Sequence, residues 1–498
     1  MSVENRCNKT RYGIVGGLGS LGAADIFFKL VKAVPSASGA EQPELIFEQH
    51  PFAEGNAPGE SSAAQSGRKL YVFDMIRQFE NRRVDAVLLP CFLSHTFIDE
   101  LKAESRLPIV SMMDALSEYV GRRHPNARRL GVLTSDYVRT KGLFEHHFSD
   151  PCWELLYPSE DIQKTCVMPA IYGPEGIKAG HLHGTAVERL VLACRNLMEQ
   201  GAELIIPGFT EIPIVLDALT QLGLPVIDAN LIYARYTIAN GAQASAKEFK
   251  IGIVGGVGPA ATVDFVGKIV RHTRANKDQE HIKLVIEQNP QIPDRTENLI
   301  GNGTDPTVAL YSTCKKLEAA DADVIAIPCN TAHAFVERIQ PYLGIPVINM
   351  LTATVEHVQA TLPGNATVGL LATNGTVRSG IYADAAAKVG IKLLIPDEAN
   401  QTKVMNAIYG ERGVKAGFTD GECRDELFIA LSHLVERGAS AVILGCTELP
   451  LVLGANPRFV IAGKTVAVLD PTEILAKKCI ALGARTGHVE SRKPSLEQ

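Results

Sequence analysis

Two cysteines, Cys329 and Cys446, each follow an apolar run that predicts a buried strand. These runs, residues 323–328 and 441–445, are rich in β-branched side chains and end at a proline and a glycine, as parallel strands covered on both faces often do. Ligands of open α/β sheets gather at the carboxyl ends of such strands. Two thiols delivered there by similar strand–loop units can face one substrate from opposite sides. Such a pair can remove a proton from one face of a carbon and return a proton to the other.

The sequence repeats itself at about half its length, and matched positions differ by 237 to 239 residues. Such collinear copies indicate a tandem duplication. The polar segment 240–247 is the predicted linker, which gives one domain over residues 1–245 and another over residues 246–498. The matched segments are residues 12–19 and 251–258, 90–95 and 328–333, 171–180 and 408–417, and 207–213 and 444–450.

Each half contains two predicted lobes. In the second half, one lobe opens at residues 250–255 and the next at residues 366–373, and both lead through helical patterns to a cysteine-bearing strand. Alternating strands and helices predict parallel sheets covered by helices on both faces. The predicted fold class is α/β, with four Rossmann-like (flavodoxin-like) lobes in two pairs, each pair closing on a cleft.

The two copies differ chemically. The first half keeps one thiol, Cys91, and lacks the other, so it cannot perform the same two-sided proton transfer. We therefore predict that residues 246–498 are catalytic and that residues 1–245 are a degenerate copy. The aligned positions are Phe209 for Cys446, Phe92 and Leu93 for Asn330 and Thr331, Asn56 near Arg295, and Lys178 for Lys415.

Composition narrows the class of protein. Apolar residues make up 46% and charged residues 21% of the 498 residues, the balance of a globular protein. The net charge of −6 offers no basic surface for nucleic acid. An apolar run long enough for a signal peptide or a membrane span is absent from the sequence. Ten irregularly spaced cysteines favour free thiols in a reducing, cytoplasmic setting over a disulfide framework.

The second half closely resembles the aspartate/glutamate racemases, which act without pyridoxal phosphate. The resemblance covers roughly residues 249–484 and implies an isomerase that needs no cofactor and no metal. It favours the aspartate racemase branch and an acidic amino acid as substrate, aspartate first, with glutamate as the alternative. Family members are typically single copies of about half this length. The motifs that carry the resemblance are residues 255–259, 289–296, 328–333, 372–376, 414–417 and 445–448.

The resemblance also implies roles for individual residues. Cys446 would take the proton from the L-enantiomer and Cys329 from the D-enantiomer. Arg295 would bind the side-chain carboxylate of the substrate, because a guanidinium can grip a carboxylate through two hydrogen bonds, and Lys415 would be the second cation. The remaining positions expected to contact the substrate are Gly255, Gly256, Asn330, Thr331, Thr373, Thr447 and Glu448.

Several residues also have simpler interpretations. A single cysteine at a strand end is usually a core residue, and Cys91 alone fits that interpretation or that of a relic. The spacing between Cys329 and His333 suggests a metal, but zinc needs three or four ligands, so His333 is expected to support the cysteine loop. Residues 17–22 fit a dinucleotide fingerprint, which the second copy lacks. Arg295 could belong to a surface ion pair, and Lys415 could be a solvated loop residue.

Two other functions remain open on the sequence. A related two-cysteine enzyme could act on a hydantoin or on maleate, although Arg295 disfavours neutral substrates. Alternatively, the protein could be an amino-acid-binding module without catalysis, which the decayed first half with its Lys178 suggests. We also expect the first half to dock against the second as a pseudo-dimer in place of the homodimer contact of single-copy relatives, and a homo-oligomer of the whole chain remains open.

Overall fold

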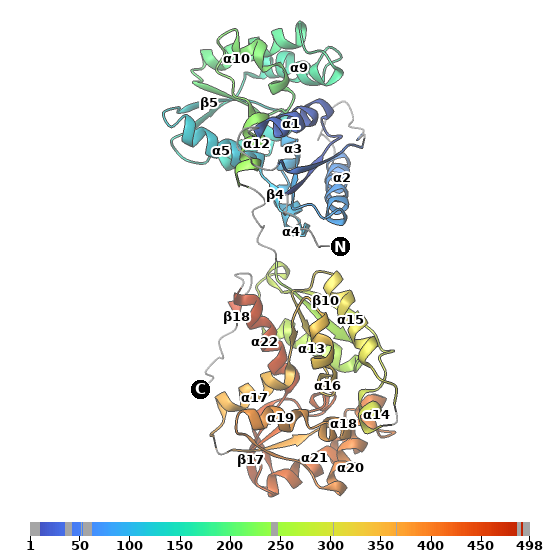
Figure 1. Cartoon of the computed structure of the whole chain (residues 1–498). Coiled ribbons are helices and arrows are strands. Elements are labelled where there is room, and N and C mark those ends of the chain that lie inside the picture. The colour runs from blue at the N-terminus through green and yellow to red at the C-terminus, as the bar shows by residue number, and fades with distance from the viewer. Residues whose placement is uncertain are drawn as a thin grey trace. The chain divides into compact units, whose positions relative to one another are not determined.

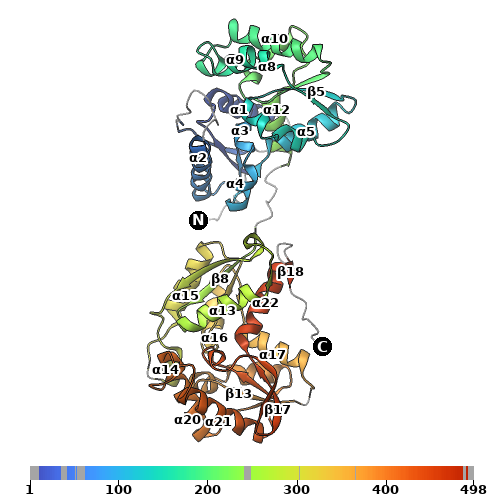
Figure 2. The same cartoon turned by 180° about the vertical axis from the view of Figure 1, so that it is seen from behind.

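The computed structural model describes residues 10–34, 42–50, 52, 62–240, 248–301, 303–364, 366–485 and 490–491. The chain divides into two compact units, which we call unit 1 (Met1–Lys247) and unit 2 (Glu248–Gln498), as Figure 1 shows. Each unit consists of two lobes, which Figure 2 presents from behind. Asn56 and the predicted linker beyond Asn240 lie outside the described residues.

The first lobe of unit 2, the β8 lobe, is built on a parallel sheet with the strand order β10-β8-β11-β12. Following the chain, β10 is added on one side of β8, and β11 and β12 are added on the other side. The loops that leave β8 and β11 therefore diverge, and this switch point of the sheet leaves a crevice. The strands are β8 (Lys250–Gly255), β10 (Lys283–Gln288), β11 (Val324–Ala326) and β12 (Val347–Ile348). The helices are α13 (Pro259–His272), α14 (Arg295–Ile300), α15 (Thr307–Ala319), α16 (His333–Ile339) and α17 (Met350–Thr361).

The second lobe of unit 2, the β13 lobe, has the order β14-β13-β15-β17-β16, with its own switch point between β13 and β15. The edge strand β16 runs antiparallel to β17, because a tight turn joins the two. The strands are β13 (Thr367–Leu371), β14 (Lys392–Leu394), β15 (Ala441–Leu444), β16 (Asn456–Ile461) and β17 (Lys464–Leu469). The helices are α18 (Asn374–Arg378), α19 (Ile381–Lys388), α20 (Glu398–Tyr409) and α21 (Glu422–Glu436).

The C-terminal elements of unit 2 pack against its first lobe. The last helix, α22 (Pro471–Arg485), packs against α13 and α17 in the β8 lobe. The short strands β9 (Thr273–Arg274) and β18 (Glu490–Ser491) pair there in an antiparallel ribbon. The chain therefore passes between the two lobes twice, and these two connections keep the lobes together on either side of the cleft.

Unit 1 repeats this plan with the sheets β2-β1-β3-β4 and β6-β5-β7. We call its lobes the β1 lobe and the β5 lobe. The strands are β1 (Arg11–Val15), β2 (Glu44–Glu48), β3 (Ala86–Leu88), β4 (Ile109–Val110), β5 (Arg129–Leu133), β6 (Glu154–Leu156) and β7 (Leu204–Pro207). The principal helices are α1 (Ser20–Ala33), α2 (Ser62–Asn81), α3 (Phe92–His95), α4 (Ile98–Glu104), α5 (Met112–Arg123), α6 (Asp136–Thr140), α7 (Leu143–His147), α8 (Glu160–Ile162), α9 (Met168–Tyr172), α10 (Thr185–Glu199), α11 (Leu216–Thr220) and α12 (Ala229–Asn240).

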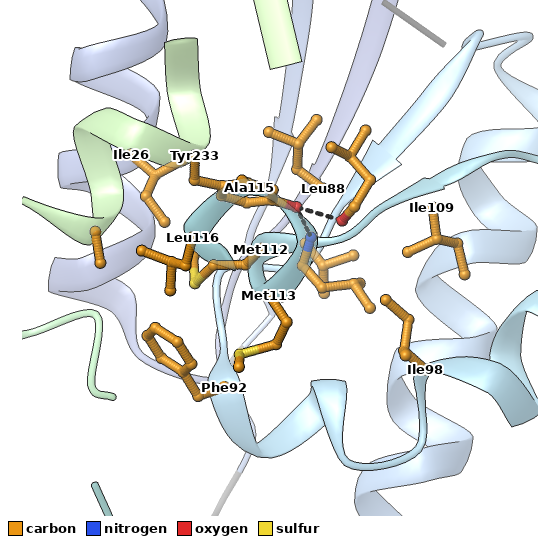
Figure 3. Packing of buried hydrophobic residues seen from close by; sticks show 14 of the residues in the cluster. Ile26, Leu88, Phe92, Ile98, Ile109, Met112, Met113, Ala115, Leu116 and Tyr233 are labelled. Carbon is orange, nitrogen blue, oxygen red and sulfur yellow. Dashed lines mark hydrogen bonds between the residues drawn. The ribbon is translucent and has the colours of Figure 1, made fainter. Parts of the chain in front are cut away.

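The core of the β1 lobe is closed by the returning helix α12, whose Tyr233 is fully buried. The Tyr233 hydroxyl donates to the carbonyl of Val110 at 2.8 Å and accepts from the amide of Leu89 at 3.2 Å. Figure 3 shows the ring among the apolar side chains of this core, with both hydrogen bonds dashed. A buried tyrosine needs such partners for its hydroxyl, and here they fix α12 to the strand ends.

These observations confirm the predicted α/β class with four sheets in two tandem pairs of lobes. The repeated strand order explains why the prediction succeeds, since each half carries the same succession of apolar strands and amphipathic helices. In the described part of the chain, no helix combines the length and apolar composition needed to cross a lipid bilayer.

Candidate active site

Cys329 and Cys446 line one cavity between the two lobes of unit 2, with an empty volume of about 270 Å³. Cys329 follows β11 and Cys446 follows β15, so each thiol stands at the switch point of its own sheet. Both side chains are buried. The residues lining the cavity are Val257, Arg295, Thr296, Cys329, Asn330, Thr331, Thr373, Tyr409, Lys415, Cys446, Thr447 and Glu448.

Cys446 is held as a thiol by its surroundings. Its Sγ donates to Glu448 Oε2 at 3.0 Å. Burial raises the pKa of Cys446 well above its ordinary value, the Glu448 carboxylate raises it further, and the cation of Lys415 opposes these effects. Gly258 makes room for Glu448, since a Cβ at this glycine, which has φ +119°, would lie 2.4 Å from Glu448 Oε1.

Cys329 has a different neighbour, the cation of Arg295. Burial lowers the pKa of Arg295, but Cys329 and Asp294 outweigh it and raise this pKa above its ordinary value. Arg295 Nη1 donates to the backbone carbonyls of Ile292 and Pro293 at 3.2 and 3.1 Å. Its Nε is buried and has no hydrogen-bond partner among the described residues. A buried donor without a partner is costly, so this atom is available to a ligand.

Asn330 supplies a second donor of the same kind. Tyr382 on α19 donates its hydroxyl hydrogen to Asn330 Oδ1 at 2.6 Å and thereby fixes the orientation of the amide. Asn330 Nδ2 is buried and, within the described ranges, has no hydrogen-bond partner. Two unsatisfied donors, from Arg295 and Asn330, thus belong to residues lining the cavity.

Hydroxyl groups from both lobes meet at the cavity wall. Thr331 Oγ1 lies 3.2 Å from Thr373 Oγ1 and 2.8 Å from Thr376 Oγ1. Thr296 donates to Thr373 Oγ1 at 3.1 Å. Thr373 also caps α18 by accepting from the amide of Thr376. The cluster is buried, and its rotatable hydroxyls can reorient toward a bound carboxylate.

Lys415 approaches the cavity from a 3-10 turn, Val414–Ala416. Its Nζ lies 3.1 Å from the hydroxyl of Tyr409, 4.2 Å from the centre of that ring and 3.7 Å from Asp294 Oδ2. Burial lowers the pKa of Lys415, but Glu448, Tyr409 and Cys446 outweigh it and raise this pKa, which keeps the side chain charged. Burial raises the pKa of Tyr409 to about 12, so Tyr409 stays a neutral hydrogen-bonding group.

His333 positions the loop that carries Cys329. Its Nδ1 donates to the carbonyl of Cys329 at 2.9 Å, and its Nε2 accepts from the amide of Met350 at 3.1 Å. Burial lowers the pKa of His333, which favours the neutral ring that this pair of bonds requires. Both nitrogens are therefore engaged with the backbone. Within the described ranges, no three His, Cys, Asp or Glu side chains form a group able to hold a metal.

The cavity brings together most of the residues singled out from the sequence, but Gly255 and Gly256 are not among its lining residues. The amide of Gly256 donates to Thr262 Oγ1 at 3.2 Å, and the next residue, Val257, reaches the cavity. Sequence reasoning missed Tyr409, Thr296, Thr376 and the supporting Tyr382. The repeated segment around residues 408–410 held a signal for Tyr409, whereas nothing local marks Tyr382.

The comparisons with known proteins agree on one family. The sequence model of the Asp/Glu/Hydantoin racemase family matches residues 15–237 and again residues 254–479. The chain belongs to this family. The two separate matches also show that the racemase unit occurs twice in tandem, and the enzyme class that follows is an amino-acid racemase, an isomerase.

Individual relatives in this family are named for different substrates. The broad specificity amino-acid racemase RacX of Bacillus subtilis is 25% identical over 237 residues, which is 46% of this chain and 96% of that protein. A glutamate racemase of Deinococcus radiodurans is 33% identical over 158 residues, 31% of this chain and 50% of that protein. The solved aspartate racemase of Picrophilus torridus is 31% identical with a TM-score of 0.43, covering 49% of this chain and 96% of its own.

Proposed function

We propose that unit 2 racemises an acidic amino acid, L-aspartate to D-aspartate, by proton transfer between two thiols without a cofactor. The observation that carries this proposal is the pair of buried, unsatisfied donors, Arg295 Nε and Asn330 Nδ2, in a cavity that both Cys329 and Cys446 line. Two buried donors that no group among the described residues satisfies fit a ligand that carries carboxylates.

In the proposed chemistry one cysteine acts as the base and the other as the acid. A thiolate on one side takes the α-proton, the C–H electron pair passes to the α-carbon, and the thiol on the other side delivers its proton to the opposite face. Each catalyst at contact distance contributes about 10²- to 10⁴-fold. The negative charge that develops on the α-carboxylate is met by Asn330 and by the hydroxyls of Thr331 and Thr373.

The electrostatic surroundings distinguish the two thiols. The Glu448 carboxylate accepts a hydrogen bond from the Cys446 thiol and thereby favours the protonated form of Cys446. A thiolate formed on Cys329 would face the guanidinium of Arg295. A two-base racemase needs one thiol as acid and one thiolate as base, and each turnover exchanges the two roles.

Substrate preference follows from the charged groups. Arg295 and Lys415 are the two cations at the cavity, and we assign the side-chain carboxylate of aspartate to Arg295. We restrict catalysis to unit 2, because Phe209 in unit 1 stands at the position of Cys446. Free thiols at the site suit a reducing, cytoplasmic setting.

The test is α-proton exchange in D₂O with purified, reduced protein and L-aspartate, followed by NMR and optical rotation together. Exchange with loss of rotation is the expected result. Exchange with full retention of rotation would mean that only one thiol works and would overturn the two-thiol proposal. Parallel samples with L-glutamate, maleate and a hydantoin show whether another substrate is turned over instead, which would overturn the assignment to aspartate.

A further inference from the structure

Unit 2 contains a second cavity, which is lined by the three helices α16, α17 and α19 and shares no lining residue with the candidate active site. Its volume is about 560 Å³, within the range of small-molecule sites. The three helices, labelled in Figure 1, come from both lobes of unit 2. His333, which holds the Cys329 loop, forms part of the wall.

The floor of this cavity is apolar. Leu351 and Val355 on α17 are buried, and both line the cavity together with Ile381 on α19. An apolar floor favours a ligand with an apolar body, because their contact removes both surfaces from water.

The rim of the cavity is charged, and most of the charge is negative. Glu337, Glu356, Asp384 and Lys388 all line it. Glu356 Oε2 lies 3.0 Å from Lys478 Nζ and is thereby paired. Within the described ranges, Glu337 on α16 and Asp384 on α19 form no ion pair. These two carboxylates outnumber the one ammonium group of Lys388, so the rim is complementary to a cation.

Unit 1 fills the corresponding space with side chains of its own. The repeat places His147 of α7 at the position of Ala385 and Asp114 of α5 at the position of Thr352. His147 Nε2 lies 3.7 Å from Asp114 Oδ1, and its Nδ1 donates to the carbonyl of Leu143 at 3.0 Å. An imidazole ring beside a carboxylate therefore bridges two helices of unit 1, where unit 2 has only a methyl group and a hydroxyl.

The helix that lines the cavity also reaches the candidate active site. Tyr382, the neighbour of the cavity-lining Ile381, donates to Asn330. In unit 1 the corresponding Phe144 stacks on Phe92 instead, with ring centres 5.8 Å apart. A ligand in the cavity would therefore contact a helix that orients the loop carrying Cys329 and Asn330.

A cavity that lacks a side chain can bind a small molecule of the missing shape, as engineered apolar cavities bind benzene. The comparison of the two units shows that the missing shape is an aromatic ring, and the rim lacks positive charge. We propose that this cavity of unit 2 binds a small primary amine that carries an aromatic ring. The ring lies over Leu351 and Val355, and the ammonium group lies at Glu337 and Asp384.

A ligand-observed NMR titration of the full chain with 2-phenylethylamine tests the proposal. The comparison compounds are 2-phenylethanol, which is neutral, and 3-phenylpropionate, in which the charge is reversed. Thr352→Asp combined with Ala385→His introduces the pair of unit 1 into unit 2 and fills the cavity with side chains that this fold already accommodates. Binding is measured directly, so the result does not depend on racemisation in unit 2.

We expect 2-phenylethylamine to bind saturably at one site, and the two comparison compounds to bind roughly threefold more weakly or worse. The filled variant should weaken binding of the amine by roughly tenfold or more, because its ring occupies the site. Glu337→Gln combined with Asp384→Asn should weaken binding roughly two- to fivefold, the value of exposed charge pairs. This second variant serves if the filled one folds poorly, because both of its sites are exposed.

Glu436→Gln is the control, since it removes an exposed carboxylate of α21 that does not line the cavity, and it should bind the amine as the parent does. No saturable binding of 2-phenylethylamine, equal binding of 2-phenylethanol or 3-phenylpropionate, or unchanged binding in either double variant would each overturn the proposal.

Discussion

Cys446 Sγ and Glu448 Oε2 lie 3.0 Å apart, with the thiol as donor. This contact makes the two thiols of unit 2 unequal, because Cys329 faces the cation of Arg295 instead. A carboxylate beside a thiol disfavours the thiolate, and a guanidinium favours it. The two cysteines of unit 2 therefore differ in the charge of their nearest ionisable neighbour, a carboxylate for Cys446 and a guanidinium for Cys329.

The Glu448→Gln variant tests this asymmetry. Glu448 raises the pKa of Cys446, so removal of its charge should lower that pKa and move the onset of thiolate formation to lower pH. The measurement is the rate of Cys446 alkylation against pH on peptide 438–458. Glu411→Gln, an exposed site in the same unit, is the control and should leave the profile in place. An upward shift in Glu448→Gln would contradict the electrostatic interpretation.

Removal of either thiol should stop racemisation. Cys329→Ser and Cys446→Ser should each lower kcat for L-aspartate by about 10³-fold or more, because a serine hydroxyl is a far weaker base. Optical rotation measures the loss. Cys423→Ser is the matched control, since Cys423 is buried on α21 and its thiol donates to the carbonyl of Phe418, which serine can also do. Full activity in either active-site variant would remove the two-thiol mechanism.

Arg295→Lys should weaken substrate recognition more than its conserved charge suggests. Lysine cannot supply the Nε donor while also contacting the carbonyls of Ile292 and Pro293. We expect kcat/KM for aspartate to fall roughly 10- to 100-fold, the value of a charged hydrogen bond, mainly through KM. Steady-state kinetics provide the check. Arg378→Lys, at an exposed position on α18, should change neither constant, and an unaltered KM in Arg295→Lys would argue against the role assigned to Arg295.

Tyr382→Phe should affect both stability and binding. It removes the donor to Asn330 Oδ1 and leaves a buried acceptor unsatisfied, at a cost of about 1–3 kcal/mol in the free energy of unfolding of unit 2. Urea denaturation measures this cost, and aspartate kinetics should show a raised KM because the Asn330 amide can rotate. Tyr342→Phe, where the side chain is 71% exposed, should leave the unfolding free energy within about 0.5 kcal/mol of the parent value. Equal stability of the two variants would show that the hydrogen bond contributes little.

The sequence predicts the fold well because its signals are local and occur twice. Each cysteine follows a recognisable strand, and the repeat offset aligns Lys178 with Lys415 and Phe209 with Cys446. These signals were enough to predict four sheets in two pairs of lobes.

Contacts between elements that are distant along the chain could not be predicted from the sequence. Tyr382 reaches Asn330 from a helix 52 residues later in the chain, and no spacing rule links them. Arg68 lies beside Cys91, although alignment of the halves pairs it with Pro306 and directs attention to Asn56 instead. An alignment of the two copies therefore cannot predict that the cation beside the Cys91 thiol comes from another helix.

The stacked pair Phe92 and Phe144 cannot be exchanged one residue at a time for the Asn330 and Tyr382 pair of unit 2 without a loss of stability. Phe144→Tyr alone would bury a hydroxyl with no amide to receive it, and Phe92→Asn alone would bury an amide against an aromatic ring. Each single step back costs about 1–3 kcal/mol, a large part of the stability of an ordinary domain. Both one-step paths toward the pair of unit 2 therefore pass through a protein of lower stability. The hydrogen-bonded pair of unit 2 and the stacked pair of unit 1 are thus alternative solutions that single substitutions do not interconvert without cost.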